Sequence, residues 1–500
     1  MKFELPRSAK NWISLIGATI AIIVLFMMIF LFVIATFFSG QPIYLGIIIY
    51  MLLPAVLILG LILIPVGMLL NRKKISKTQN SLPFIDLNLK RHRNAVTLFV
   101  LGTAIFFLLS AIGSYEAFHY TESVEFCGTL CHEVMKPEYD AYQHSSHARV
   151  ACAECHIGAG ADWFVKAKIS GLHQVISVLT NEYSKPIPTP IANLRPARET
   201  CEQCHWPQKF YANKQRLERH YLNDEENSEW DIYLNMKLGS QLSARSFDEG
   251  IHWHINPDVK IEYISTHEQK ENISWVRYTN LKTGDVTIYN NEEDTLDEEQ
   301  IQEFDISLMD CMDCHNRPAH SYKPPAFFIN EAITAGIIPI ELPEIKSLAM
   351  QICAEEFSTT DSARQYIEKT VIEFYEEDYP EIAESKMKMI KQAVKGIQDK
   401  FVVNIFPEMN VKWDAYPNHI GHLEFDGCFR CHDDQHVSED DKAISRDCNI
   451  CHTIKAQGPP EDLEMATITG FIDFRHPGGE IEEDEWMDTN CTECHTGLDP

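Results

Sequence analysis

The sequence predicts a membrane-anchored protein in which three transmembrane helices precede a mainly α-helical, loop-rich region with a small β-containing insertion. Two observations predict this class. Apolar stretches long enough to span a bilayer are confined to the first 115 residues. All 15 cysteines lie beyond them, and fourteen of these form closely spaced pairs that are each followed by a histidine.

Composition and charge exclude several other classes. The 500-residue chain is 45% hydrophobic and 10% aromatic, which is too apolar for a disordered protein. Ten of the 43 Lys and Arg lie in residues 1–115, but only two of the 72 Asp and Glu do. The remainder of the chain is therefore strongly acidic, and an acidic surface repels phosphate. No nucleic acid is expected as a partner.

Three apolar stretches make up the membrane anchor, residues 1–115. A helix needs about 20 residues to cross the hydrocarbon layer, so the first two stretches span it with room to tilt and the third just spans it. Pro54 and Pro65 are expected to kink the second. The stretches are Trp12–Phe38, Ile43–Leu70 and Ala95–Ile112, with an apolar continuation through Tyr115 and Phe118.

Basic residues predict the orientation of the anchor. Three precede the first stretch and seven fill the loop between the second and third. By the positive-inside rule both segments are cytoplasmic, so the N-terminus is cytoplasmic and the chain after about Tyr115 is periplasmic. A cleaved signal peptide is the alternative for the first stretch, but the stretch is long for one and no small-residue cleavage site follows.

The cysteine pairs have the pattern that attaches c-type haem. Two thiols one turn apart bind the two vinyl groups, and the next histidine is held under the iron as its proximal ligand. Six motifs have the spacing Cys-x-x-Cys-His, and a seventh is longer by one residue. They are Cys152/Cys155/His156, Cys201/Cys204/His205, Cys311/Cys314/His315, Cys428/Cys431/His432, Cys448/Cys451/His452, Cys491/Cys494/His495 and the longer Cys127/Cys131/His132. Seven covalently bound haem c groups are therefore expected, and they should replace much of an ordinary hydrophobic core.

Two other interpretations of the motifs are weaker. Structural zinc needs four ligands from paired Cys-x-x-Cys modules and gives no reason for a histidine at every motif. A disulfide within Cys-x-x-Cys closes a very short loop and stabilises little. Cys353 is the odd cysteine, and we interpret it as a buried structural thiol in preference to a redox group.

The haem irons are expected to take second, distal ligands from the remaining histidines. Fourteen histidines lie outside the motifs. His92 and His267 are expected at the surface, and of His252 and His254, which alternate as on a strand, at most one is expected to reach a given iron. The distal candidates are Met135, His147, His220, His252, His254, His320, His419, His422, His436 and His476.

The chain after the anchor divides into four parts. Residues 116–215 carry three haem motifs, and residues 216–305 carry none but contain alternating runs typical of strands. Residues 306–402 hold the fourth motif and a segment with helical periodicity from about 341, broken at Pro380. Residues 403–500 carry the last three motifs.

The order of these features resembles the NapC/NirT/NrfH family of membrane-anchored multihaem quinol dehydrogenases. The resemblance covers residues 95–215, from the third apolar stretch through "EFCGTLCHEVMKPEYDAYQHSSHARVACAECH" to "RPARETCEQCHWP". With three spans and seven motifs, the whole chain looks like the heptahaem inner-membrane branch of that family. The resemblance implies a methionine ligand at the first haem. Met135 is the candidate, although it follows His132 by three residues and the motif's cysteines are one residue further apart than in the family.

A candidate quinol site follows the second motif. Quinol oxidation releases protons, so a protonatable side chain is needed beside the first haem. The amphipathic segment "GADWFVKAKISGLHQ" is suited to the membrane interface and offers Asp162, Lys166, Lys168 and His173. The resemblance singles out Lys168, twelve residues after His156, at the spacing of the family's quinol-site lysine. The lysines can equally be contacts to lipid headgroups.

Two function classes are compatible with this sequence. The first is an inner-membrane quinol dehydrogenase, a quinol:cytochrome c oxidoreductase that takes electrons from menaquinol or another quinol. It passes them to periplasmic c-type cytochromes or a reductase in anaerobic respiration or extracellular electron transfer. The alternative is a terminal reductase of a small nitrogen or sulfur oxyanion, which needs one iron with an open position. Many distal candidates favour the first. Both a monomer and a homo-oligomer are compatible with the sequence.

Overall fold

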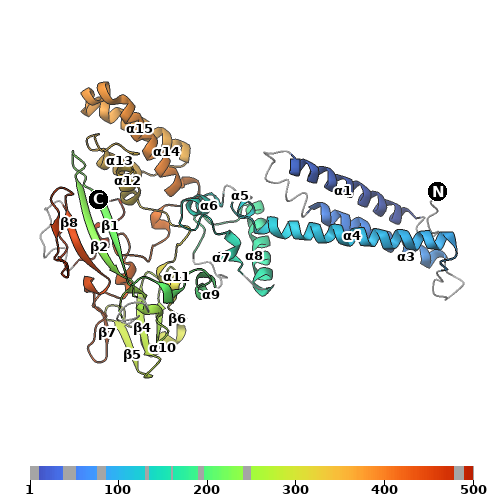
Figure 1. Ribbon diagram of the computed structural model, residues 1–500, viewed down its shortest axis with the longest axis horizontal. Coiled ribbons are helices and arrows are strands. Elements are labelled where there is room, and N and C mark those ends of the chain that lie inside the picture. Colours follow the sequence, from blue (N-terminus) through green and yellow to red (C-terminus); the bar gives the residue numbers. More distant parts are fainter. Residues whose placement is uncertain are drawn as a thin grey trace. The chain divides into compact units, whose positions relative to one another are not determined.

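The computed structural model describes residues 11–37, 52–75, 86–129, 134–158, 161–189, 196–239, 249–477 and 489–498. The chain forms two compact units. The first comprises Met1–Met135 with Ala151–Ala153, and the second comprises Lys136–Val150 with Glu154–Pro500. The two units are coloured from blue to red along the sequence in Figure 1.

Long apolar helices build the first unit. Three of its helices are long and apolar enough to cross a membrane, which confirms the predicted spans. Pro54 lies in the first turn of the second of these, where its missing N–H costs no hydrogen bond, and Pro65 lies inside the helix. The helices are α1 (Trp12–Phe37), α3 (Leu53–Ile75), α4 (Lys90–Glu122) and the short α5 (Val124–Thr129).

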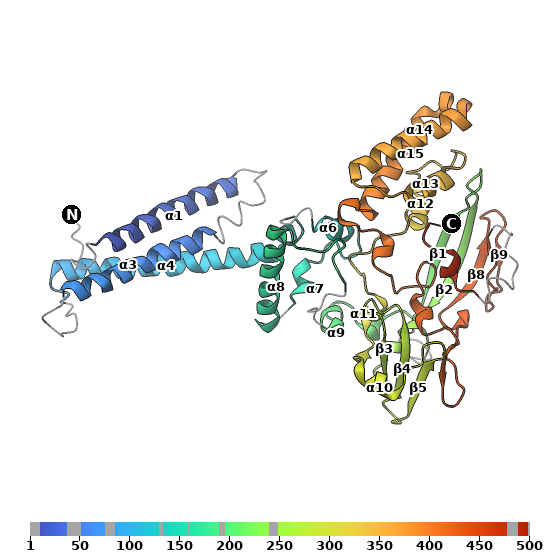
Figure 2. The same ribbon diagram turned by 180° about the vertical axis from the view of Figure 1, so that it is seen from behind.

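Helices α1 and α3 lie side by side in both views (Figures 1 and 2). Gly17 and Gly60 allow this approach, because a Cβ added to Gly17 would lie 2.6 Å from the Gly60 carbonyl oxygen. The Ser14 hydroxyl also donates a hydrogen bond of 2.9 Å to the Ile64 carbonyl across the same contact. Small residues therefore bring these two apolar helices together without a polar core.

Many short helices and two antiparallel sheets build the second unit. The helices are α6 (Lys136–Gln143), α7 (Cys152–His156, which begins in the first unit), α8 (Ala161–Thr180), α9 (Ala197–Cys201), η3 (Pro207–Lys209), η4 (Ile251–Ile255), α10 (Glu298–Glu303), α11 (Cys311–Cys314), α12 (Pro325–Thr334), α13 (Ile345–Ala354), α14 (Thr360–Asp378), α15 (Pro380–Asn404), η5 (Pro407–Met409), η6 (Trp413–Ala415), η7 (Gly427–Arg430), η8 (Cys448–Ile450) and α17 (Cys491–Cys494). The strands are β1 (Asn213–Tyr221), β2 (Glu229–Lys237), β3 (Val259–Ser265), β4 (Ile273–Asn280), β5 (Val286–Asn291), β6 (Ser307–Leu308), β7 (His436–Ser438), β8 (His452–Gly458) and β9 (Glu464–Met465).

The sheets join segments that the sequence places far apart. One sheet has the order β1-β2-β8-β9 and the other β6-β3-β4-β5-β7. Strand β2 pairs with β8 and β5 pairs with β7, so both sheets take strands from the C-terminal part. The predicted β-containing insertion, residues 216–305, is therefore not a separate module, and strand structure extends beyond it. Strands β7 and β9 are too short to give a clear alternation in sequence, and β8 begins at the motif residue His452.

An apolar core lies among helices α12 to α15, where α14 and α15 run side by side in Figure 2. This segment confirms the helical periodicity predicted from about residue 341, and Pro380 starts α15. Phe328, Ile367 and Phe401 are almost fully buried in the core. Cys353 is buried with them, and burial raises the pKa of its thiol to about 12, as expected for a structural cysteine.

Candidate haem-binding site

The described cysteine pairs are carried by single helical turns. In four motifs the backbone N–H of the histidine donates to the carbonyl of the first cysteine at 2.7 to 3.1 Å, as in His205 to Cys201 and His495 to Cys491. This bond continues the turn, so the imidazole starts directly beside the two thiols. The fourteen described cysteines form no disulfide. No group of three or more metal-ligating side chains suited to zinc occurs among the described residues either.

Four of the predicted attachment cysteines are more exposed than expected for thiols that bind haems in the interior. A thiol bound to an enclosed haem should be enclosed too, but Cys155, Cys204, Cys448 and Cys494 are exposed, whereas the other described motif cysteines are partly buried. Cys155 lies in the short helix α7, none of whose residues is buried, and Cys204 lies beyond the end of α9. In both turns the first thiol is partly buried and the second is exposed.

The expectation that seven haems replace much of an ordinary core stays a prediction. At Cys155 and Cys204 the chain presents one attachment point to solvent, so a haem bound there would have an edge at the surface. An exposed thiol can still form a thioether, since attachment needs only that the thiol reach a vinyl group. Haem attachment at each motif cysteine therefore stays a prediction from the motifs.

Five motif histidines each face one histidine from another part of the chain. The ring centroids of these pairs are 5.9 to 6.2 Å apart. Metal–imidazole bonds are about 2 Å long, so one iron held between two opposed imidazoles separates their centroids by about 6 Å. The pairs are His156 with His320, His205 with His147, His432 with His254, His452 with His422 and His495 with His476.

Hydrogen bonds orient many of these rings through one nitrogen. Nδ1 lies 2.8 to 3.1 Å from a backbone carbonyl oxygen in His254, His320, His147, His432 and His476. An N–H that donates from Nδ1 leaves the lone pair on Nε2, which is the tautomer that binds a metal. The rings are therefore held with the ligating nitrogen bare.

His252 is the candidate partner of His315. His252 lies in electrostatic contact with His315, and burial together with that contact lowers the pKa of His252 to about 4. Its Nδ1 is buried without a hydrogen-bond partner. His252 and His254 lie on a 3₁₀ helix, not on the predicted strand. His254 faces His432, whereas the charge that acts on His252 is that of His315, so the two lie near different motif histidines.

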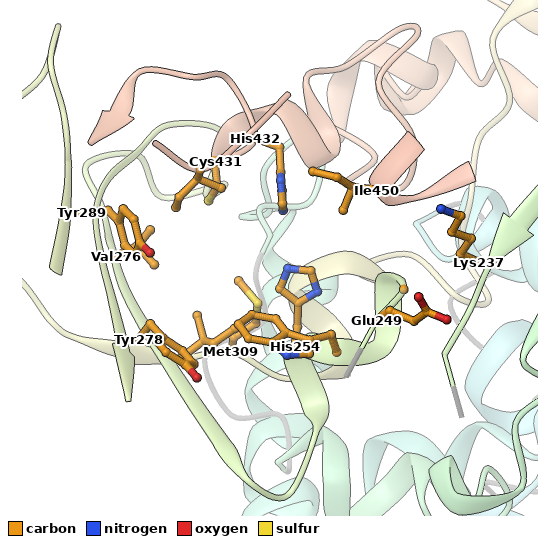
Figure 3. A pocket seen from close by; sticks show the side chains of 14 residues that line it. Lys237, Glu249, His254, Val276, Tyr278, Tyr289, Met309, Cys431, His432 and Ile450 are labelled. Carbon is orange, nitrogen blue, oxygen red and sulfur yellow. The ribbon is translucent and has the colours of Figure 1, made fainter. Parts of the chain in front are cut away.

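The pair His254 and His432 lies on either side of a cavity of about 540 Å³ (Figure 3). Cys431 lies on the same side as His432, and the walls are mainly apolar and aromatic, with Met309, Tyr278 and Tyr289 among them. Lys237 and Glu249 bring charge to one part of the lining. A cavity with two opposed imidazoles, a thiol and apolar walls fits a planar apolar group that carries iron, so the residues fit haem c.

Two distal candidates are wrong in this structure. His436 is fully buried, with Nδ1 2.9 Å from the Asp433 carboxylate and Nε2 2.9 Å from the Ile273 carbonyl oxygen. His419 has its two ring nitrogens 3.1 and 3.0 Å from the carbonyl oxygens of Asp313 and Gln269. Neither ring offers a free nitrogen to an iron. They hold elements together instead.

His220 also differs from the expectation. It lies on β1 in electrostatic contact with His495, and burial lowers the pKa of its imidazole to about 4. The ring that faces His495 at 6.0 Å is that of His476. His220 is therefore a neutral neighbour of the seventh motif, and His476 is its distal candidate.

The first motif is only partly described. Cys127 lies on α5, and its thiol is hydrogen-bonded to Cys152 of the second motif, which lowers the pKa of Cys152 to about 7. Cys131 and His132 lie outside the described residues, and Met135 follows them directly before α6. Whether Met135 ligates iron stays a prediction.

The candidate quinol residues share helix α8. Lys166 lies with its ammonium 4.6 Å from the Trp163 ring centroid, Lys168 is half-buried and His173 is exposed. The side chain of Asp162 lies outside the described residues. One apolar stripe of the helix is exposed to between 51% and 81%, formed by Val165, Ile169, Leu172, Ile176 and Leu179. This amphipathic face confirms the helical pattern predicted for the segment.

Sequence reasoning missed the residues that support the ligands. Glu138 accepts from His320 Nδ1 through both its carbonyl and its carboxylate, at 3.0 and 3.1 Å. Arg430, inside the fifth motif, donates to the Asp313 carbonyl of the fourth at 2.7 Å. Glu138 lies far from His320 in sequence, so no local pattern indicates its role.

Comparison with known proteins agrees with this site. The model of the NapC/NirT cytochrome c family, N-terminal region, matches residues 89–187. The chain belongs to the NapC/NirT family of c-type cytochromes, and it is a membrane protein of electron transport that binds haem c covalently.

Two relatives cover different parts of the chain. It is 41% identical over 489 residues to the cytochrome c-type protein ImcH of Geobacter sulfurreducens, covering 97% of this chain and 95% of that protein. It is 28% identical over 167 residues to the cytochrome c-type protein NrfH of Wolinella succinogenes, covering 32% of this chain and 92% of that protein. No solved structure is significantly similar to the chain.

Proposed function

We propose that this protein is an inner-membrane quinol dehydrogenase. It oxidises menaquinol or another quinol at its first haem and passes the electrons along seven haem c groups to periplasmic acceptors. The observation that carries this proposal is the pairing of imidazoles. Five of the six described motif histidines face a second histidine at about 6 Å, and His252 lies near the sixth, so each of these pairs would supply both axial ligands of an iron.

Filled axial positions favour electron transfer over the reductase alternative. A reductase of a nitrogen or sulfur oxyanion needs an iron that can bind its substrate. With the six described pairs as ligands, those irons would have no such position, which supports a carrier. The proposed distal ligands of the second to seventh motifs are His320, His147, His252, His254, His422 and His476 in that order.

Each haem c supplies a one-electron redox centre, and the chain determines its surroundings. Hydrogen bonds from Nδ1 to backbone carbonyls orient the imidazoles and increase their basicity. Apolar walls such as Met309 and Tyr289 exclude water from the cavity at His254 and His432. The two histidine ligands and the apolar surroundings would tune the reduction potential of each haem.

The membrane end of the proposal rests on α8. Its exposed apolar stripe suits the bilayer interface, where quinol is dissolved. Lys168, with Lys166, Asp162 and His173 on the same helix, is proposed to bind the quinol hydroxyl groups and to take the two protons released when two electrons leave. The basic segments that flank the apolar helices support a cytoplasmic N-terminus and periplasmic haem motifs.

Optical reduction of the haem-loaded protein tests this function. A naphthoquinol added anaerobically should reduce the haems of the detergent-solubilised protein, and an oxidised soluble c-type cytochrome should reoxidise them. Nitrite, hydroxylamine and sulfite should leave the reduced spectrum unchanged. Rapid reoxidation by one of these three, without reduction by quinol, would favour the reductase.

A further inference from the structure

We propose that the second to seventh haem motifs form a single unbranched electron relay in the order of the sequence, and that electrons leave to the soluble acceptor from the seventh motif. The inference rests on the proposed function, which supplies electrons at the membrane end. It depends on contacts that link each motif to the next one.

The second and third motifs are linked through their distal histidines. His320, the partner of His156, lies two residues after Pro318. The Pro318 carbonyl oxygen lies 3.1 Å from Nδ1 of His147, which is the partner of His205. One short loop therefore positions the distal sides of both haems next to each other.

The third and fourth motifs meet through their cysteines. Helix α9, which ends at Cys201, contacts α11, which begins at Cys311, and the two thiols are hydrogen-bonded to each other. Each thiol is a point of covalent attachment to a haem edge. The attachment points predicted for the third and fourth haems therefore lie close together.

Arg430 links the fourth motif to the fifth. Its guanidinium donates hydrogen bonds of 2.7 Å to the carbonyls of Asp313 and Lys270. Asp313 lies between the two cysteines of the fourth motif, and Arg430 lies between those of the fifth. The Cys314 thiol of the fourth motif also lies near enough to the Cys428 thiol of the fifth for their charges to interact.

The last two links share one imidazole. Phe429 of the fifth motif stacks on His422 with ring centroids 4.4 Å apart. His422 is the partner of His452 in the sixth motif, and its Nδ1 lies 3.6 Å from the Cys491 sulfur of the seventh. His422, a ring of the sixth motif's pair, therefore contacts residues of both the fifth and the seventh motifs.

An exit at the seventh motif follows from its place at the end of the series together with its exposure. Cys494 is exposed, so an acceptor can approach the haem edge attached there. Cys155, Cys204 and Cys448 of the second, third and sixth motifs are exposed as well, so exposure by itself does not select the exit. The seventh motif is the last link among the described contacts, and electrons that reach it have no further haem to enter.

Carbon monoxide can lock individual irons. It binds ferrous iron with an open axial position, so replacing a distal histidine with alanine should let it hold one haem in the ferrous state. The variants are His147→Ala, His252→Ala, His254→Ala, His422→Ala and His476→Ala. His267→Ala, at an exposed histidine, is the matched control. Turnover from naphthoquinol to a soluble c-type cytochrome is measured without the gas, with it, and after its removal by light.

The relay predicts that carbon monoxide abolishes turnover in all five variants, relative to the parent and His267→Ala under the same gas, and that light restores it. Continued turnover under carbon monoxide in any of the first four variants would show that the relay branches or that electrons leave earlier. Continued turnover in His476→Ala would show that electrons leave before the seventh haem. Either result overturns the proposal.

Iron positions provide a second measurement that is independent of turnover. A cryo-electron-microscopy structure of the haem-loaded parent should show each of the six irons nearest to those of the preceding and following motifs. A different order of the irons overturns the relay. This test still applies if carbon monoxide binds the first haem of the parent and so inhibits its turnover as well. A parent that quinol does not reduce refutes the proposed function and leaves the iron order to be judged by itself.

Discussion

An imidazole binds iron only through a nitrogen whose lone pair is free and faces the metal. The hydrogen bonds around each ring therefore separate ligands from structural histidines. His254 uses Nδ1 on the Ile251 carbonyl and faces His432 with its other side. His436 uses both nitrogens, on Asp433 and Ile273. Two buried histidines of the same chain thus have opposite roles.

Replacing His254 with alanine should change one haem from low spin to high spin. The haem should stay attached, because Cys428 and Cys431 still hold it. Electron paramagnetic resonance of the oxidised protein measures the change. His436→Ala is the matched comparison and should keep every iron low spin while destabilising the protein by about 3 kcal/mol, since it leaves Asp433 without its buried partner. An unchanged spectrum for His254→Ala would return that residue to a structural role.

Replacing Lys168 with alanine should slow haem reduction by naphthoquinol about a hundredfold, the range typical of a lost proton acceptor. Reduction by dithionite should be unaffected, because dithionite needs no quinol site. Lys388→Ala, an exposed lysine on α15, is the control. Equal quinol rates for Lys168→Ala and the parent would remove Lys168 from the site, and slow dithionite reduction would indicate a damaged fold.

At the scale of elements, the helices with an apolar core are separate from the turns that carry the haem motifs. Helices α12 to α15 bury an ordinary apolar core and carry no haem motif. The motif-bearing turns are short, and the turn with Cys431 and His432 lines the cavity at His254. The stability of helices α12 to α15 therefore depends on the packing of their own apolar core.

Lys346 on α13 makes this stability depend on pH. Its side chain is fully buried, with its ammonium 2.8 Å from Asn330 Oδ1, and burial lowers its pKa from 10.5 to about 7. Between these values the unfolded chain binds more protons than the folded one, so stability should rise with pH from about 7 to about 10, by up to about 1.4 kcal/mol per pH unit.

Urea unfolding followed by circular dichroism at pH 7 and pH 9 measures this dependence. The variant Lys346→Met removes the titrating group and should lose the upward slope whatever its absolute stability. A parent and variant with equal slopes would show that Lys346 is charged in the folded state.

At the scale of the whole molecule, fourteen motif cysteines predict seven haems. The intact mass of the mature protein should exceed that of the polypeptide by seven haem groups, and denaturation should release none of them. A mass with six haems would show that one motif, with the longer Cys127/Cys131 motif as the first candidate, does not attach haem.

The asymmetry of charge predicts the orientation of the molecule in the membrane. A fluorescent protein fused after Arg91 should fold in the cytoplasm, and alkaline phosphatase fused after Pro500 should be active in the periplasm. The reverse pattern would contradict covalent haem attachment as well, because c-type haems are attached outside the cytoplasm.

Local patterns in the sequence determined the chemistry of attachment and the membrane anchor. A Cys-x-x-Cys-His motif is complete within one helical turn, and a membrane span is complete within one helix, so neither needs distant residues. The helices α13 to α15 could likewise be predicted from their periodicity.

Only the tertiary structure decided which histidine faces which motif, and which motif thiols, such as Cys155 and Cys204, lie at the surface. His320 reaches His156 across a long stretch of chain, and His419 is excluded as a ligand by carbonyls that other elements supply. The physical reason is that a distal ligand is defined by a distance and a free lone pair, and exposure by what covers a side chain. These depend on contacts between segments, which residue spacing does not encode.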